Sequence, residues 1–253
     1  EDAAADTATD TAASGETIKI GVSVADQSNP FYVDIVDGME SAAKDGDELV
    51  IVDAGFDAAK QLNDIDDMIQ QGVKVMLIDP VDSNAIKSAV EACDAAGIPV
   101  IAYNSPLNFE IAEVCLDRAN GFKDAIAEYP DIKIVEEQEI QPGTDTALPV
   151  AENILQAYPD LAGMFALNDP SALGCVAAVE SANLLDQVQI VGVDGSDDAK
   201  AAIAEGKMLA SAAQDPVQIG SVAIETAYKV IAGEEVEKDI KIPSYLVDAS
   251  NAK

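Results

Sequence analysis

Histidine and tryptophan are absent from this chain of 253 residues, and arginine occurs once, as Arg118. Without histidine the chain cannot form a Ser-His-Asp or Cys-His nucleophile, and most kinds of zinc site are excluded as well. The three cysteines, Cys93, Cys115 and Cys175, are too few and too scattered for a disulfide framework or a CxxC metal site. Each lies in an apolar stretch, which predicts a small buried side chain. We therefore expect no enzyme, no bound metal and no cofactor.

Positive charge is also scarce, because 14 basic residues face 47 acidic ones and the formal net charge is −33. Nucleic acid is excluded as a partner, since binding phosphates requires a basic surface. An anionic membrane surface is disfavoured for the same reason. No apolar run approaches the length that crosses a membrane. With 49% hydrophobic residues, however, the chain can build a substantial core.

Residues 1–16 contain only Ala, Thr, Asp, Glu, Ser and Gly. Such a segment has no large apolar side chain to bury, so we expect a flexible acidic tether. It is similar to the stalk that follows a lipidated cysteine in exported proteins, although that cysteine is not in this chain. The expected location is therefore the periplasm or the extracellular cell surface, with a lipid anchor as a further possibility.

From residue 17 onward, short β-branched runs alternate with segments of helical period. In the first half the predicted strands are 18–24, 49–52, 75–78 and 99–103, and the predicted helices are 31–44, 58–71 and 84–96. Most of these strands are apolar throughout, which is typical of a parallel sheet covered on both faces. A helix between each pair of strands indicates right-handed βαβ crossovers.

A second set of elements follows residue 108. The predicted strands are 132–136, 163–167, 189–193, 209–214 and 240–246, and the predicted helices are 110–128, 147–157, 171–184, 197–205 and 218–231. The sequence therefore predicts an α/β fold of two doubly wound parallel-sheet lobes. Ligands of such sheets bind beyond the carboxyl ends of the strands, so the loops at those ends are the candidate site.

In the first half, three loops at strand ends carry polar or aromatic side chains. Asn29 can cap the following helix, and Phe31 and Tyr32 lie just inside its first turn. The two rings cannot both face the sheet, so at least one should overhang the ligand crevice. Asn104 follows the fourth strand and is either a ligand group or an ordinary turn former. The segment 79–83 after the third strand is interpreted as a turn and helix cap.

In the second half, Asn168, Asp194 and Gln214 lie at the ends of three consecutive predicted strands. Each alone is a cap or turn candidate, but together they predict a polar cage for a neutral, hydroxyl-rich ligand. Arg118 offers a rigid fork of donors that lysine cannot imitate, and the alternative is a solvated residue beside Asp117. No glycine-rich phosphate-binding motif follows any strand.

Several short blocks lie along the chain in a fixed order: Ile20–Ser23 with Asn29–Tyr32, Gly97–Ile101, Arg118 before Gly121-Phe122, Phe165–Asp169 with Ala172–Gly174, Ile190–Gly195, and Ala213–Pro216 with Ile219-Gly220. Through these blocks the chain, from residue 17 to about 245, resembles the ribose/galactose-type periplasmic binding proteins, the solute receptors of sugar ABC importers. The resemblance implies a periplasmic binding protein type I fold, in which three crossing segments join two lobes and the ligand lies in a cleft between them. The implied lobes are residues 17–106 plus 215–241 and residues 107–214 plus 242–253.

The resemblance also implies roles for the candidate residues. Asn29 would bind a sugar hydroxyl, Phe31 or Tyr32 would flank a ring face, and Arg118 would donate to the ring oxygen or a neighbouring hydroxyl. The cage would be completed by Asn168, Asp194 and Gln214.

The chain departs from the family pattern at several positions. Relatives often have Asp-Arg after the fourth strand, where this chain has Asn104-Ser105, so the site lacks one charged pair. Aromatic residues are missing near Pro142 and at Val193, and Leu116 replaces the farther of two family arginines. Ribose itself is therefore not favoured. The calcium loop of the galactose type is not visible, which supports the expectation of no metal.

A larger departure lies between Leu107 and Asn108, where the family has about one further strand–helix–strand unit. Either the unit is deleted or its residues are missing from the recorded chain. A true deletion would remove an interior strand of the second sheet and expose an edge.

The expected function is that of a secreted, monomeric receptor that delivers a small neutral sugar or polyol to the membrane permease of an ABC importer. The alternative is the ligand-binding component of a system that senses a sugar or furanose signal. A sugar-responsive repressor would need a DNA-binding segment where the acidic tether lies. A hydrolase using Asp169 and Asp194 has little support, because two acids near a crevice are expected by chance in so acidic a chain.

Overall fold

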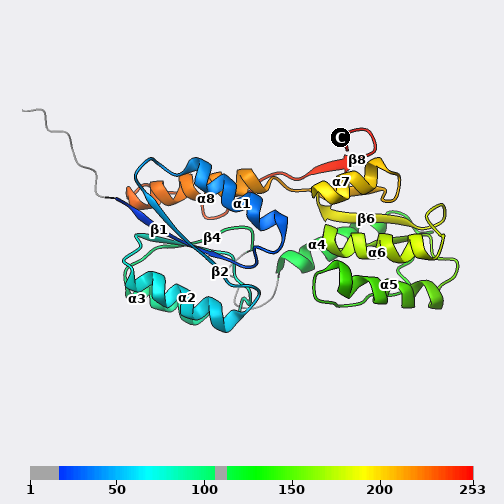
Figure 1. Cartoon of the computed structure of the whole chain (residues 1–253), viewed down its shortest axis with the longest axis horizontal. Helices are drawn as coiled ribbons and strands as arrows, with labels where there is room; N and C mark the ends of the chain where they lie inside the picture. The colour runs from blue at the N-terminus through cyan, green and yellow to red at the C-terminus, as the bar shows by residue number, and fades with distance from the viewer. Residues whose placement is uncertain (1–16, 106–112, 253) are drawn as a thin grey trace, which may run out of the picture.

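A computed structural model describes residues 17–105 and 113–252, with side chains described from residue 118 onward in the second range. The elements form two bodies, each built on a four-stranded sheet (Figure 1). The first sheet has the order β2-β1-β3-β4, and all its neighbouring strands are parallel. Its strands are β1 (Lys19–Val24), β2 (Glu48–Asp53), β3 (Val75–Ile78) and β4 (Val100–Ala102).

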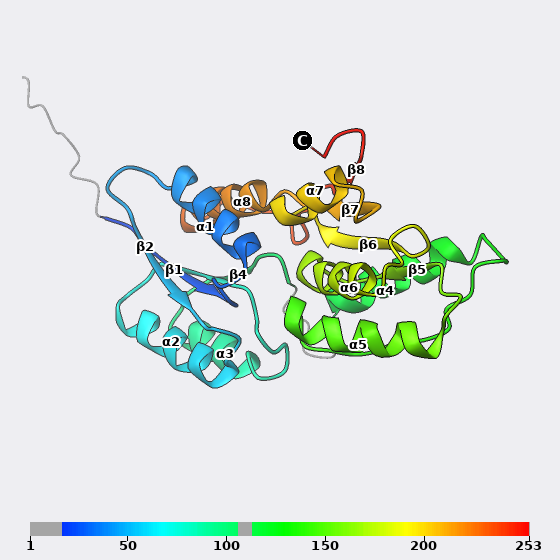
Figure 2. The ribbon, with the colours of Figure 1, turned by 45° about the vertical axis from the view of Figure 1, so that its right-hand side comes forward.

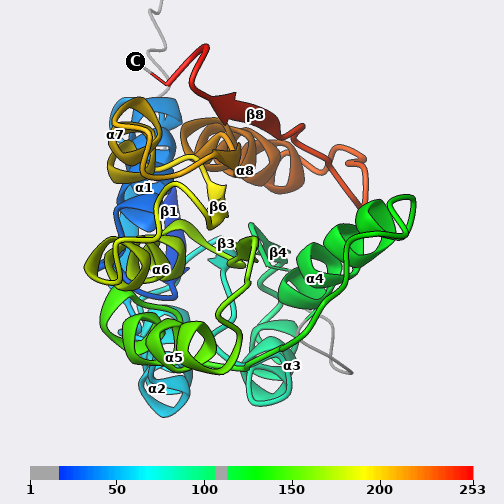
Figure 3. The same ribbon diagram turned by 90° about the vertical axis from the view of Figure 1, so that its right-hand side faces the viewer.

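Helices cover both faces of the first sheet, as the apolar strands predict. Helices α1 (Pro30–Ala42) and α8 (Pro216–Ile231) lie on one face, and α2 (Ala58–Gln70) and α3 (Lys87–Ala95) lie on the other (Figures 1 and 3). The Asn29 side chain accepts a hydrogen bond from the Phe31 backbone N–H and so caps α1. Asp57 caps α2 through the Lys60 backbone N–H.

The second sheet has the order β5-β6-β7-β8. Its strands are β5 (Gly163–Phe165), β6 (Gln189–Asp194), β7 (Ala210–Ala213) and β8 (Tyr245–Asp248). Its helices are α4 (Glu113–Ile126), α5 (Thr144–Ala157), α6 (Asp169–Ser181) and α7 (Asp197–Ala204). The prediction of two doubly wound α/β lobes is confirmed, but the prediction of a wholly parallel second sheet is wrong, because β8 runs antiparallel to β7.

Two predicted strands of the second lobe are also wrong in place or extent. Residues 132–136 form no strand, although their β-branched side chains suggested one, and Ile132, Ile134 and Val135 are exposed. A strand requires a neighbour, and within the described residues β5 pairs with β6 alone, which leaves an open edge. The last strand begins at Tyr245, so the predicted strand over 240–246 came mostly too early in the chain.

The chain passes between the two bodies more than once. After β7 it returns to the first body, where α8 packs against α1, and it then goes back to form β8 in the second sheet. Figure 1 shows both passages in the orange and red part of the ribbon. An earlier passage follows β4 and lies partly outside the described residues. The lobe boundaries at 106/107, 214/215 and 241/242 stay predictions.

Helices α1 and α8 approach each other at two glycines. A Cβ atom on Gly38 would collide with the Val217 backbone, and one on Gly220 would collide with the Ile35 backbone. The absence of side chains at these two positions therefore sets the distance between the helices. Among the described residues, no helix is both long and apolar enough to cross a membrane.

The cores of the two lobes differ in side-chain size. In the first lobe, isoleucine, valine, leucine and methionine fill the space on both faces of the sheet. In the second lobe, alanine is the commonest buried residue. Since the stabilisation from burial scales with the apolar area removed from water, the second lobe gains less from each buried residue.

We predict that Gly220→Ala lowers the free energy of unfolding by roughly 1–3 kcal/mol, because the new methyl group forces α1 and α8 apart. Gly121→Ala is the matched control, since Gly121 lies inside α4 with nothing near the position of its Cβ. That change should stabilise the protein by roughly 0.5–1 kcal/mol. Urea titration measures both values, and equal effects of the two substitutions would contradict the close-packing argument.

We also predict that the second lobe opens more readily than the first. Amides of β5 and β6 should exchange with solvent through openings of lower free energy than amides of β1 and β3, owing to the alanine-rich core and the open edge at β5. Hydrogen exchange of the ligand-free protein, followed by mass spectrometry, measures the difference. Equal protection of the two sheets would show that neither feature weakens the second lobe.

Candidate functional site

The carboxyl ends of strands β1 and β6 point toward the region between the two lobes (Figures 1 and 2). On the second-lobe side, Arg118 of α4 donates a hydrogen bond of 2.7 Å from its Nη1 atom to the Leu167 carbonyl. The same Nη1 lies 3.3 Å from Asp194 Oδ1 at the end of β6. Gln214, which follows β7, donates a 3.0 Å hydrogen bond from Nε2 to that oxygen. The structure thus brings together three of the residues predicted from sequence.

Asp194 is strained and nearly buried. Its φ angle of 122° is unusual for a residue with a side chain, and it is 8% exposed. Burial raises the pKa of Asp194 to about 6, with the Arg118 guanidinium acting in the opposite direction. Strain and a raised pKa gathered at one strand end are typical of functional sites.

Asp169 lies next to Asp194, where its backbone hydrogen bond lowers the pKa of Asp194 and its charge raises it. Its carboxylate is fully buried and accepts hydrogen bonds of 2.7 Å from both Ser211 Oγ and the Ser196 backbone N–H. These bonds tie the start of α6 to β7 and to the start of α7. Asp169 is therefore a structural residue, which argues against the hydrolase alternative.

Asn168 precedes α6, and its Oδ1 accepts a 2.9 Å hydrogen bond from the Ser171 backbone N–H. The side chain therefore caps the helix, which was the simpler of its two sequence-based interpretations. It still lies next to Leu167, whose carbonyl receives Arg118, so it borders the same cluster.

On the first-lobe side, the two aromatic residues at the start of α1 have different environments. Phe31 is 9% exposed and packs into the core of the lobe, whereas Tyr32 is half-buried at its margin. The Tyr32 ring forms edge contacts with Phe31 and Phe56, at centroid distances of 5.5 and 6.4 Å. Asn29 is half-buried, and its side-chain oxygen is used by the helix cap.

Tyr32 belongs to the first lobe, but charged residues of the second lobe shift its pKa. Burial raises the pKa of its phenol, the negative charges of Asp79 and Asp194 raise it further, and Arg118 lowers it. Since Asp194 and Arg118 belong to the second lobe, their charges act on Tyr32 across the region between the lobes. We call Tyr32, Asn104, Arg118, Asp194 and Gln214 the interlobe cluster.

Asn104 joins this cluster through a residue that the sequence reasoning missed. Its backbone is left-handed, with a φ angle of 62°, and its Nδ2 donates a 3.1 Å hydrogen bond to Asp79 Oδ2. Asp79 was interpreted as part of a turn, yet it is 1% exposed, and burial raises its pKa to about 6. The available signal was its position, since it directly follows a fully buried apolar strand, much as Asp194 is the last residue of β6.

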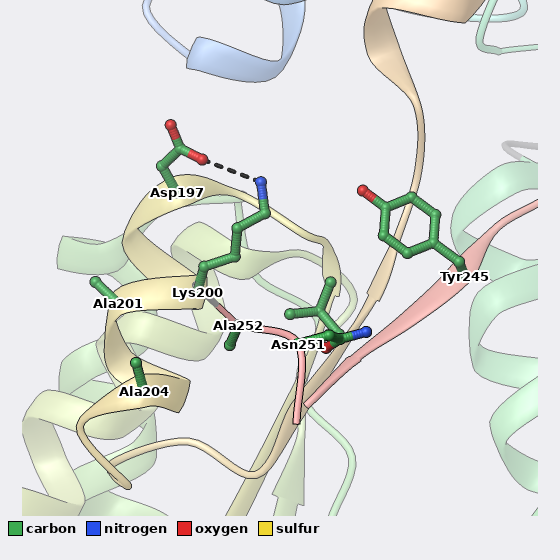
Figure 4. Close-up of a pocket in the computed structure, with 8 residues that line it drawn as sticks. Asp197, Lys200, Ala201, Ala204, Tyr245, Asn251 and Ala252 are labelled. Carbon is green, nitrogen blue, oxygen red and sulfur yellow. Dashed lines mark hydrogen bonds and ion pairs between the residues drawn. The ribbon is translucent and has the colours of Figure 1, made fainter. Parts of the chain in front are cut away.

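A surface hollow of about 550 Å³ lies elsewhere, between α7 and the C-terminal segment (Figure 4). Asp197, Lys200, Tyr245 and Asn251 are among its lining residues, and Lys200 Nζ lies 3.0 Å from Asp197 Oδ1. None of the predicted ligand residues lines it. The hollow therefore does not compete with the interlobe cluster as the candidate site.

Metal and thiol chemistry have little support in the described part of the chain, where no three His, Cys, Asp or Glu side chains gather closely enough to hold a metal ion. Cys93 is buried and Cys175 half-buried, and burial raises the pKa of each thiol to about 11. Thiols with such pKa values are poor nucleophiles at neutral pH. The side chain of Cys115 lies outside the described residues.

Comparison with known proteins places this geometry in a family. A family model described as a periplasmic binding protein domain matches residues 20–117 and 112–235. The ribose import binding protein RbsB of Bacillus subtilis (strain 168) is 34% identical over 261 residues, covering 88% of this chain and 85% of that protein. RbsB of Escherichia coli (strain K12) is 32% identical over 267 residues, covering 90% of each.

Solved structures agree with the sequence matches. A solute-binding protein of an ABC transporter from Mycobacterium smegmatis, with bound glycerol, has a TM-score of 0.85 and 34% identity, covering 94% of this chain and 96% of that one. A periplasmic solute-binding protein from Actinobacillus succinogenes 130z, with bound D-allose, has a TM-score of 0.84 and 28% identity, covering 93% of this chain and 99% of that one.

The alignments also bear on the shortage in the second lobe. The B. subtilis alignment spans 261 positions, but 88% of 253 residues is only about 223, so the relative has residues that this chain lacks. The family match consists of two segments that overlap at residues 112–117, close to the predicted gap between Leu107 and Asn108. Fold, family match and relatives lead to one conclusion: the chain belongs to the periplasmic binding proteins, among the ribose/galactose-type sugar-binding proteins, which are solute receptors rather than enzymes.

Proposed function

We propose that this protein binds a small neutral sugar or polyol between its two lobes and delivers it to the membrane permease of an ABC importer. The observation that carries the proposal is the interlobe cluster, in which donors and acceptors from the ends of several strands lie near one aromatic ring. The printed ligands of the relatives and neighbours, among them ribose, glycerol and D-allose, are all rich in hydroxyl groups and support the same ligand class.

In this proposal the second lobe supplies most of the hydrogen bonds. Arg118 donates to a ring oxygen or hydroxyl, and Asp194 and Gln214 hold hydroxyls in the plane of the ring. Asn168 adds a polar contact beside them. Because Arg118 and Gln214 already share one oxygen of Asp194, the three side chains are held in place before the ligand arrives.

The first lobe supplies the opposite wall. Tyr32 covers a face of the ring, Phe31 supports it from the core, and Asn29 and Asn104 border it. A ligand that contacts both lobes binds the closed arrangement more tightly than the open one, so it shifts the population toward closure. The closed form would present a surface to the permease.

The proposal places the receptor outside the cytoplasmic membrane as a monomer, in line with periplasmic relatives. Residues 1–16, predicted to be a tether, lie outside the described residues, and anchoring by lipid belongs to the proposal only. No observation favours the sensing alternative over import.

A thermal-shift screen of pentoses, hexoses and polyols tests the function. A ligand that binds only the folded protein raises the melting temperature by mass action. We expect at least one neutral sugar or polyol to do so. A cooperative melting transition that no member of the panel moves would contradict the proposed ligand class.

We predict that Arg118→Ala and Arg118→Lys each weaken binding of that ligand by at least about tenfold, because lysine keeps the charge but loses the fork of donors. Arg118→Lys should disturb the free protein less, since it leaves a cation beside Asp194. Lys123→Ala on the same helix is the control, because Lys123 pairs with exposed Glu137. Calorimetric titration measures the affinities. Unaltered affinity in both Arg118 variants would show that the residue has only a structural role.

We predict that sugar affinity falls as the pH falls through about 6, by about tenfold between pH 7 and pH 5, because the charged form of Asp194 holds Arg118 and accepts hydroxyls. The free energy of unfolding of the ligand-free protein should instead rise as the pH falls. The pKa of Asp194 is higher in the folded than in the unfolded chain, so its ionisation costs stability above pH 6, and this cost disappears below about pH 4. Titrations with Asp194→Asn, which cannot ionise, should give a flatter affinity profile. A wild-type affinity that is constant from pH 5 to pH 7 would contradict this role.

A further inference from the structure

Asp79 is a buried acid that takes part in none of the proposed sugar contacts. It follows β3 at the carboxyl edge of the first sheet and is 1% exposed. Its backbone is fixed on both sides, because its N–H donates to the Ser23 carbonyl at 3.0 Å and its carbonyl accepts from Gln61 Nε2 at 2.8 Å. The backbone that carries the carboxylate is therefore held in place at the strand end.

The two oxygens of this carboxylate have different environments. Oδ2 accepts the hydrogen bond from Asn104 Nδ2, whereas Oδ1 is buried and has no hydrogen-bond partner within the described residues. Asp79 also forms no ion pair with a described lysine or arginine. Burying a carboxylate with one unpartnered oxygen and no cation is costly, and Asn104, Ser105 and Tyr32 offset only part of that cost, because the pKa of Asp79 stays raised.

The hydrogen bond fixes the orientation of Asn104. An ionised carboxylate only accepts hydrogen bonds, so the amide nitrogen of Asn104 must face Asp79 and the amide oxygen must face away from it. The left-handed backbone at Asn104 keeps the side chain at this strand end. What Asn104 offers to a ligand is therefore an acceptor, which matches a hydroxyl donor.

The charge of Asp79 also acts on the interlobe cluster. Among the charged groups that shift the pKa of Tyr32, Asp79, Asp194 and Asp26 raise it, and Arg118 alone lowers it. Arg118 already pairs with Asp194, so the charge of Asp79 remains uncompensated. An anionic ligand near Tyr32 would meet repulsion that a neutral polyol does not experience.

We propose that Asp79 is a specificity-determining residue of the sugar site, which turns the acceptor oxygen of Asn104 toward the ligand and makes the site select neutral polyols over their carboxylated counterparts. This inference rests on the proposed function. Asp79 acts through Asn104 and through its field, so it is a positioning residue that does not itself contact the ligand.

The test compares matched ligand pairs on matched variants. The probes are D-galactose with D-galacturonate and D-glucose with D-glucuronate, followed by the neutral compound that gives the largest thermal shift with its own terminal carboxylate. Asp79→Asn removes the charge at nearly constant shape. Asp82→Asn is the control, because Asp82 lies in the same loop, is exposed and caps its turn through an oxygen that asparagine retains.

We expect the wild type to bind the neutral member of a pair at least about tenfold more tightly than the carboxylate. Asp79→Asn should weaken neutral binding and reduce this ratio by about tenfold, since the repulsion is gone and the Asn104 amide is free to turn over. Asp82→Asn should change neither quantity by more than about twofold. A merely structural role of Asp79 would lower both affinities together and leave the ratio unchanged, which would overturn the inference.

Asn104→Gly supplies a second variant if Asp79→Asn does not fold, since glycine suits the left-handed backbone. It should weaken neutral binding while keeping the discrimination against carboxylates, because Asp79 retains its charge. Wild-type affinity in this variant, or loss of the discrimination, would overturn the inference.

A readout on the ligand-free protein is available as well. The side-chain NH₂ signals of Asn104, identified by their loss in Asn104→Gly, should shift with a midpoint near pH 6 as Asp79 titrates. The groups around this carboxylate are Tyr32, Tyr103, Asn104 and Ser105, none of which titrates near that pH. The pKa of Asp194 is also raised to about 6, so the titration is repeated in Asp194→Asn, where the shift of the Asn104 signals should remain. Signals that stay constant would overturn the orientation argument.

The failures of the two proposals are distinguishable. A protein whose melting temperature no neutral sugar or polyol raises overturns the sugar site, and this inference with it. A protein that binds a neutral sugar with the same discrimination in the wild type and in Asp79→Asn overturns this inference alone.

Discussion

The contact between α1 and α8 joins two helices from opposite ends of the chain, and the geometry between the lobes depends on it. Gly38 and Gly220 allow the two backbones to approach so closely that α8 belongs to the first lobe, although the strand before it belongs to the second. The chain must therefore cross between the lobes directly after β7. Gln214 lies at this crossing, which places its amide beside Asp194. The close packing of α1 against α8 thus determines the position of one site residue, Gln214.

Each lobe buries a carboxylate at the end of a central strand, but the two carboxylates have different partners. Asp194 is paired with the single arginine of the chain and with Gln214, so its charge is shared. Asp79 has only neutral neighbours, namely the Asn104 amide, Ser105 and Tyr32. The single arginine therefore lies on the second-lobe side, and no described lysine or arginine forms an ion pair with the first-lobe carboxylate.

Much of this architecture could be predicted from the sequence, and the exceptions have physical causes. Apolar runs that alternate with helical segments located β1 to β4 and most helices, because a parallel sheet buried on both faces leaves a clear pattern. Residues 132–136 carry the same β-branched pattern but lack a neighbouring strand, and pairing is invisible in a local pattern. The choice between Phe31 and Tyr32 depended on packing against α8, which lies far away in the sequence.

The site residues, too, could be predicted only where a local pattern marked them. Asp194 and Gln214 could be named because strand ends of one sheet meet at one edge, and Arg118 because it is the single arginine of the chain. Asp79 could not, since Asp-Pro-Val-Asp-Ser is typical of a turn and the depth of a side chain is not written in its neighbours. The number of charged groups at the site also differs from the sequence-based prediction. The sequence suggested one charged pair fewer than in relatives, whereas the structure places the carboxylate of Asp79, which follows β3, beside Asn104.

The alanine-rich core and open edge of the second lobe have a consequence for the life of the protein in its compartment. Proteases cleave chains in proportion to the time that those chains spend locally open. A ligand that spans both lobes suppresses such opening, so an occupied receptor would survive longer than an empty one.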